Sequence, residues 1–439
     1  MGWRGWLGVA CLVLLWGTRH AFAHAVLLSS DPVDGAMLHE TPRAVAFRLN
    51  EPVQWLEVKV LDASGTSLAP PAAARLMTPE LSVVPHAPLR PGAYWAMYRV
   101  LSADSHVISG AIAFAIVGPT ETRTPSELPA SIEGIRTQHA GEPWMQFEAA
   151  RTHGHDLSPR ALLVTANRTA QLAGALLSMG IALYLLLVRG ISMDARRDLR
   201  GMGYSLALLA AVASIFAIGL QGALEIAASP MDLLFHIEPW IHGAGSRRAL
   251  ASILLIAGLL LLGAGWLPQN RLLCGALFSA GTLLILVSFT AVGHVANTLP
   301  RWPSVAAWLI HLYMAAFWLG SLLPLMNAVR ADQNAPATLK RFSKLAVPAV
   351  VLLAAAGAGI AVLQIATWSQ LTESSYGQVL IVKVALFCGM LGLAATNRFV
   401  LLPGLMRRGS EAKYAIRRAL TISIGMEMVA GMLVLVLAA

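Results

Sequence analysis

His24 is the first residue whose position suggests chemistry, because it follows Ala21-Phe22-Ala23 at the end of an apolar N-terminal leader. Small residues at these positions are typical of a signal-peptide cleavage site. Cleavage after Ala23 would give His24 a free α-amine, which with its backbone nitrogen and imidazole forms a chelate suited to Cu(II). If the leader is instead an uncleaved anchor, His24 keeps an acylated nitrogen and loses most of its chelating ability.

Asp104 and His106 form a second candidate ligand pair, in the segment Ser102-Ala103-Asp104-Ser105-His106. Residues two apart in an extended strand point to the same face, so this carboxylate and this imidazole can reach one ion together. A single Asp-x-His triplet is more often part of an ordinary loop than a ligand set. A terminal His24 in the same domain makes the metal-binding interpretation more favourable.

Further metal-binding side chains lie in or beside long apolar segments, where polar groups are costly and are functional candidates by default. His294 and His311 lie on either side of a short connection, and Met314 is about one turn beyond His311. Glu427 and Met428 lie near the middle of the last apolar segment. Each alone is often a helix contact or core packing. Together they offer the imidazole, thioether and carboxylate ligands expected along a copper path.

The first three candidates belong to residues 24–118, which are predicted to form an all-β domain. Short runs such as Val45–Leu49 and Tyr94–Tyr98 have strand-like apolar patterns, and Asp34-Gly35 and Pro91-Gly92 mark turns between strands. Regularly spaced short strands must bury one face against another sheet. A Greek-key sandwich or barrel is therefore the simplest fold.

The remaining candidates belong to an all-α membrane domain, predicted over residues 169–439. Eight apolar segments of spanning length are expected at approximately 169–188, 203–227, 249–267, 272–292, 304–326, 345–368, 378–402 and 418–438. Residues 1–23 are assigned to the signal peptide. The proline-rich stretch 119–168 is assigned to a linker, whose histidines His139, His153 and His155 are interpreted as part of a solvated tether or, alternatively, as a metal relay.

Composition restricts the class of protein. The 439 residues are 56% hydrophobic and 13% charged, with mean hydropathy +0.64, which excludes a wholly soluble chain. Residues 24–118 carry eight acidic and six basic side chains, so the net charge of +9 comes from elsewhere and does not indicate nucleic-acid binding. The same residues contain no cysteine, so the exported domain has no disulfide and binds metal through other side chains.

Basic residues in alternate loops predict the orientation in the membrane. One set of loops holds fourteen, Arg189, Arg196, Arg197, Arg200, Arg271, Arg330, Lys340, Arg341, Lys344, Arg407, Arg408, Lys413, Arg417 and Arg418. The other set holds three, Arg247, Arg248 and Arg301. The positive-inside rule makes the first set cytoplasmic. The β domain and the C-terminus are then expected on the periplasmic side of the bacterial inner membrane.

The predicted β domain resembles the CopC periplasmic copper-binding family. The resemblance rests on His24 to Pro32 with Asp34-Gly35, on Phe47 to Val53, and on Tyr94 through Gly110. It implies that His24, Asp104 and His106 hold Cu(II), with the α-amine of His24 completing a tetragonal set. The stretch 69–92 lacks the several methionines that a Cu(I) site needs, so one Cu(II) site is expected here.

The membrane part resembles the CopD family. The matching segments include Gly293-His294, Trp308 to Leu322, Arg341 to Leu345 and Asn397-Arg398. A CopC-like domain followed by a CopD-like one is an arrangement associated with copper uptake or copper resistance. The resemblance implies copper transport with Cu(I) or Cu(II) in the membrane domain, and a periplasmic or cytoplasmic copper chaperone as partner.

We expect the protein to transport copper and not to be an enzyme. The sequence contains no phosphate-cradling motif of an ATP-driven pump. Two alternatives remain open at this point. Paired histidines on neighbouring spans can hold haem, as in a haem- or copper-dependent membrane redox protein. The membrane part can also be only an anchor for a copper buffer.

The Cu(II) interpretation predicts the first residue of the mature protein. Purification from membranes followed by N-terminal sequencing should return His-Ala-Val-Leu, because only a chain that starts at His24 has the free amine that the chelate uses. Any other start removes the anchor of the predicted site.

Overall fold

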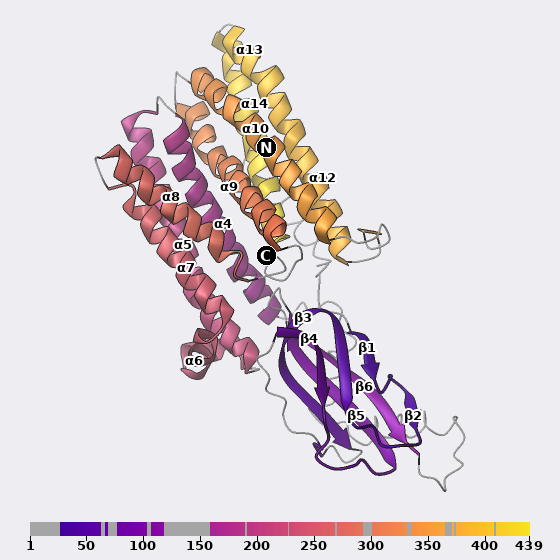
Figure 1. The fold of residues 1–439 in the computed structure, drawn as a ribbon. Coiled ribbons are helices and arrows are strands. Elements are labelled where there is room, and N and C mark those ends of the chain that lie inside the picture. Colours follow the sequence, from indigo (N-terminus) through magenta and orange to yellow (C-terminus); the bar gives the residue numbers. More distant parts are fainter. Residues whose placement is uncertain are drawn as a thin grey trace. The chain divides into compact units, whose positions relative to one another are not determined.

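The computed structural model describes residues 27–62, 66–68, 77–102, 107–117, 159–188, 191–226, 228–267, 270–292, 301–331, 335–364, 371–372, 375–407 and 410–439. The chain divides into two compact units (Figure 1). The first, Ala23–Asp156, contains the strands, and the second, which includes Leu157–Ala439, contains the helices. The predicted order of a β domain followed by a helical domain is confirmed.

The β unit is one sheet of six described strands. They are β1 (Leu27–Asp31), β2 (Ala36–Leu38), β3 (Val45–Asp62), β4 (Met77–Val83), β5 (Gly92–Leu101) and β6 (Val107–Ile116). The order is β1-β3-β5-β6-β2, with β4 also paired to β3. β2 runs parallel to β6 and the other pairs are antiparallel.

The long strand β3 organises this unit. Its first half pairs with β1 and β4, and its second half pairs with β5. Alternating residues of β3 are fully buried, among them Phe47 and Trp55, and their rings contact Tyr98 of β5. This two-residue alternation is the pattern that distinguishes a half-buried strand.

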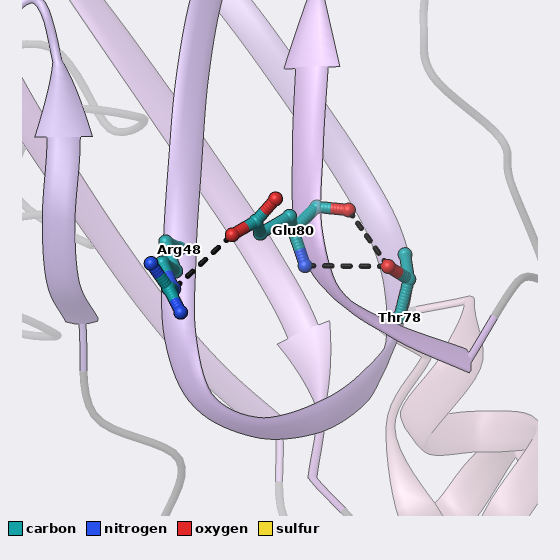
Figure 2. A network of polar contacts seen from close by, with 3 residues as sticks. All are labelled: Arg48, Thr78 and Glu80. Carbon is teal, nitrogen blue, oxygen red and sulfur yellow. Dashed lines mark hydrogen bonds and ion pairs between the residues drawn. The ribbon is translucent and has the colours of Figure 1, made fainter.

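Polar contacts hold β4 against β3. The Trp55 indole donates a 3.1 Å hydrogen bond to the Thr78 carbonyl. Figure 2 shows the outer side of the same strand pair, where Arg48 and Glu80 form a 3.1 Å ion pair and the Glu80 amide donates to the Thr78 hydroxyl. The ion pair is more than half exposed, so solvent screening leaves it little weight and the buried rings dominate.

The helical unit contains ten helices and two short irregular turns among its described residues. They are α4 (Pro159–Leu187), α5 (Met193–Glu225), η1 (Pro230–Leu234), α6 (Glu238–Ala244), α7 (Arg247–Ala264), α8 (Arg271–Ser288), α9 (Arg301–Ala331), α10 (Ala335–Gln364), α12 (Ser375–Thr396), η3 (Asn397–Leu401), α13 (Leu402–Arg407) and α14 (Ser410–Val436). Figure 1 shows the long helices side by side in a bundle. Each of the eight predicted spans overlaps a described helix, and seven of these helices are long and apolar enough to cross a membrane.

Two helices differ from the predicted spans. Seven of the described helices are long and apolar enough to cross a membrane, and the predicted fourth span, 272–292, is a shorter apolar helix that ends at Ser288. The first predicted span also starts too late, because α4 begins at Pro159, inside the stretch predicted as linker. Polar residues concealed this start in the sequence. In the fold they have partners, because the Asn167 amide donates to the Ala213 carbonyl of α5.

Small residues allow the helices to pack closely. Gly180 of α4 lies directly against Ala316 and Gly320 of α9, and Gly258 of α7 lies against Gly281 of α8. Close backbone approach at small residues is the usual source of helix association in a bilayer, where there is no hydrophobic driving force between helices. The α4–α9 contact therefore fixes the position of α9, which carries His311.

This contact gives a stability prediction for Gly180→Ala. A Cβ at residue 180 would overlap the Ala316 carbonyl, so we expect the detergent-solubilised protein to lose about 1–3 kcal/mol of stability or more. Thermal unfolding of the purified full-length protein measures the loss.

The matched control is Gly275→Ala in α8, where a Cβ meets no atom within 4 Å. Alanine is a better helix former than glycine, so this variant should be at least as stable as the parent. Equal melting temperatures for Gly180→Ala and Gly275→Ala would contradict the packing analysis.

Candidate functional site

The three predicted Cu(II) ligands, His24, Asp104 and His106, lie outside the described residues. The strands that lead to them are described. β1 begins at Leu27, opposite Leu49 of β3, and β5 ends its pairing with β3 at Leu101, opposite Gln54. The β3 residues that pair with Leu27 and Leu101 are therefore five positions apart along that strand.

His311 is the best-defined candidate in the helical unit. Its Nδ1 lies 3.2 Å from the Leu353 carbonyl of α10. Because a carbonyl only accepts hydrogen bonds, this contact assigns a hydrogen to Nδ1, and in the neutral imidazole Nε2 then keeps its lone pair. A backbone carbonyl that fixes the tautomer in this way is the usual outer partner of a metal-binding histidine.

Two neighbours fix the ring of His311 in place. Gly357 of α10 leaves the space, since a Cβ there would lie 3.1 Å from His311 Cε1 and 3.2 Å from Nδ1. The Trp308 ring lies one turn earlier on α9, nearly parallel to the imidazole at 17° and with centroids 6.4 Å apart. The imidazole is therefore positioned by packing as well as by its hydrogen bond.

Lys383 of α12 is a neighbour of His311 that the sequence interpretation missed. In the structure Lys383 is partly buried, and its ammonium group acts electrostatically on the His311 ring. The chain thus places a cationic side chain beside its candidate copper ligand.

Glu427 of α14 is 2% exposed and accepts hydrogen bonds from two other elements. The Asn397 amide donates to Glu427 Oε1 at 2.6 Å, and the Trp318 indole also donates to this carboxyl group. Asn397 begins η3, a π-helical turn of a kind that is frequent at functional sites. Trp318 lies seven residues beyond His311 on α9, so both face the same side of that helix.

The structure describes two of the three remaining membrane candidates, Met314 and Met428 but not His294. Met314 and Met428 are partly buried and pack against the main apolar core of the helical unit. His294 lies outside the described residues. Within the ranges that the structure describes, no three His, Cys, Asp or Glu side chains gather into a metal-binding group. Any membrane copper site formed by described residues would therefore use His311 with few other ligands of these types.

The acidic and histidine residues near the end of α5 do not form a described metal cluster either. His236, Glu238 and His242 are exposed on the η1–α6 segment. Glu225 accepts a 3.3 Å hydrogen bond from Gln221 of the same helix. This segment packs through Leu233 and Trp240, whose indole donates to the Leu233 carbonyl. From the sequence, these four residues are equally compatible with a metal entry site and with an ordinary surface loop.

Two regions of the chain match family models. The CopC domain matches residues 27–117, and Copper resistance protein D matches residues 336–439. The second range includes Arg341 to Leu345 and Asn397-Arg398, and it begins after the earlier motifs between Gly293 and Leu322.

The chain is similar to three copper proteins from bacteria. Copper transport protein CutJ of Bacillus subtilis (strain 168) is 25% identical over 447 residues, covering 96% of this chain and 76% of that protein. Copper resistance protein D of Pseudomonas syringae pv. tomato is 29% identical over 38% of this chain and 57% of its own length. Copper resistance protein C of Xanthomonas campestris pv. juglandis is 30% identical over 22% of this chain and 82% of its own length.

Two solved structures of copper proteins are similar to about a fifth of this chain. CopC from Methylosinus trichosporium OB3b is 24% identical and covers 23% of this chain and 100% of its own, with a TM-score of 0.19. PcoC, a methionine-rich copper resistance protein from Escherichia coli, is 24% identical and covers 21% and 99%, with a TM-score of 0.18. The copper resistance protein C relative is 30% identical and is covered over 82% of its length. Together with the match of residues 27–117 to the CopC model, this shows that the chain belongs to the CopC family.

Proposed function

We propose that this protein binds Cu(II) with its β unit outside the bacterial inner membrane and moves copper across that membrane with its helical unit. The relatives are named for copper transport and copper resistance, and the chain combines both of their domains. The transport part of this proposal rests on the environment of His311. Its imidazole lies among apolar helices, and the hydrogen bond from Nδ1 to the Leu353 carbonyl leaves Nε2 free.

The proposed Cu(II) site consists of the His24 amine and imidazole, Asp104 and His106. Its support is the register of β3, because the described strand ends nearest these residues pair with Leu49 and Gln54. Leu49 and Gln54 are five positions apart, so the described ends of β1 and β5 lie at the same middle part of β3. Nitrogen and carboxylate donors in a tetragonal arrangement suit Cu(II).

The Cu(II) site predicts a change in the electron paramagnetic resonance spectrum of the full-length protein. One equivalent of Cu(II) should give a tetragonal signal with nitrogen hyperfine splitting, and His106→Ala should reduce affinity by about tenfold or more, as loss of one ligand requires. His86→Ala is the control, because His86 is an exposed histidine of the same unit. An unchanged spectrum and affinity in His106→Ala would exclude this ligand set.

The proposed membrane path runs from His294 and His311 past Met314 to Glu427 and Met428. Its support is one face of α9, where His311 contacts α10 and Trp318 contacts Glu427 of α14. With the basic loops in the cytoplasm, copper would enter from the periplasmic side and move inward. A periplasmic or cytoplasmic copper chaperone is the partner proposed for delivery or removal.

The path predicts the copper flux of two variants. In proteoliposomes, His311→Ala should abolish uptake of radioactive copper while Cu(II) binding by the β unit is unchanged. Gly357→Ala should reduce the flux, because its methyl group would displace the His311 ring. The control is His236→Ala, at an exposed histidine of the same helical unit.

Each alternative has its own outcome in these preparations. No flux by the parent protein, with a reductant and an ion gradient present, would support a membrane-anchored copper buffer instead. A Soret absorption band that disappears in His311→Ala would support the haem-dependent redox protein.

A further inference from the structure

Two donors beside His311 have no acceptor. The Trp308 indole nitrogen is buried and has no hydrogen-bond partner anywhere in the described structure. For Lys383, the described residues likewise provide no carboxylate and no acceptor for its ammonium group. The Trp308 ring packs beside the His311 imidazole, and the charge of Lys383 acts on the same imidazole.

Each of these donors costs free energy if it remains unpaired. A buried N–H without a partner loses about 1–3 kcal/mol of hydrogen bonding to water. A charged ammonium group in a bilayer costs more, and such groups normally pair or face a functional cavity. Glu427, the carboxylate buried in α14, is engaged by Asn397 and Trp318 and shows no electrostatic action on Lys383. An acceptor bound from outside the chain would satisfy both donors.

The same arrangement disfavours a bare metal cation at His311. Like charges repel more strongly in a medium of low dielectric constant than in water. A copper ion bound to His311 Nε2 would have the Lys383 ammonium as a neighbour, without a compensating acid. An anion bound between the metal and Lys383 would turn this repulsion into attraction and would give the Trp308 N–H an acceptor.

We infer that Trp308, His311 and Lys383 form a binding site for a small monovalent anion. The Trp308 N–H and the Lys383 ammonium group donate hydrogen bonds to the anion, and His311 Nε2 remains available for copper. One positive charge without a partner matches one negative charge, and the close approach of Gly357 to the ring restricts the space. If the proposed transport holds, copper passes this point as a complex with the anion.

Chloride is the probe, and binding is measured without copper. Full-length protein in lipid nanodiscs is incubated with ³⁶Cl⁻ in a scintillation proximity assay, with sodium gluconate keeping the ionic strength constant. The parent should bind chloride saturably, at one site per chain. Lys383→Met should weaken binding by about tenfold or more, the usual effect of losing a charge-assisted hydrogen bond. Lys383→Arg should retain it.

Two further variants make the result specific. Trp308→Phe keeps an aromatic ring but removes the N–H, so it should also weaken chloride binding. Lys344→Met makes the same substitution at an exposed lysine of α10 and should bind like the parent. Melting temperatures of all variants are measured in the same nanodiscs, and only folded variants are compared.

The outcomes separate this inference from copper transport. Absence of saturable chloride binding in the parent, or equal binding by Lys383→Met and the parent, overturns the anion site whatever the copper flux is. Saturable chloride binding that depends on Lys383 supports it even if proteoliposomes show no copper flux. In that case only the proposed transport fails.

Discussion

In a lipid bilayer every polar group must find its partner inside the protein, and this constraint shapes the whole helical unit. His311 meets it through the Leu353 carbonyl, Glu427 through Asn397 and Trp318, and Arg398 through two oxygens of Ser343. These bonds join α9, α10, α12 with its π-helical turn, and α14. The candidate copper residues are therefore also the residues that connect the helices.

Most of the fold could be predicted from local patterns. The alternation in β3, with Phe47 and Trp55 buried, is visible in the sequence, and the apolar segments mark the helices. Two details could not be predicted in this way. The start of α4 at Pro159 depends on partners in another helix, such as Ala213 of α5. The end of α8 at Ser288 is not marked in the sequence, because the apolar residues continue to Val292 while the backbone leaves the helix.

The candidate site was predictable by residue type but not by environment. His311 and Glu427 are conspicuous because polar residues in apolar segments are costly. Gly357 and Lys383 are not, since one is a common small residue and the other resembles a lysine that extends to the membrane surface. Their importance arises from contacts between helices separated by more than forty residues. The proposed Cu(II) ligands rest mainly on the sequence, and the register of β3 gives them additional support.

The short helix α8 has a consequence for the surrounding lipid. Its 18 residues, like the 18 of the neighbouring α7, extend about 27 Å, slightly less than the roughly 30 Å of an average hydrocarbon core, whereas α5 has 33 residues. Leu272, Leu273 and Leu283 are exposed, so this side of the bundle faces acyl chains. Hydrophobic mismatch of this kind is relieved by local thinning of the bilayer. The protein would then favour lipids with shorter chains on the α8 side and deform the membrane asymmetrically around itself.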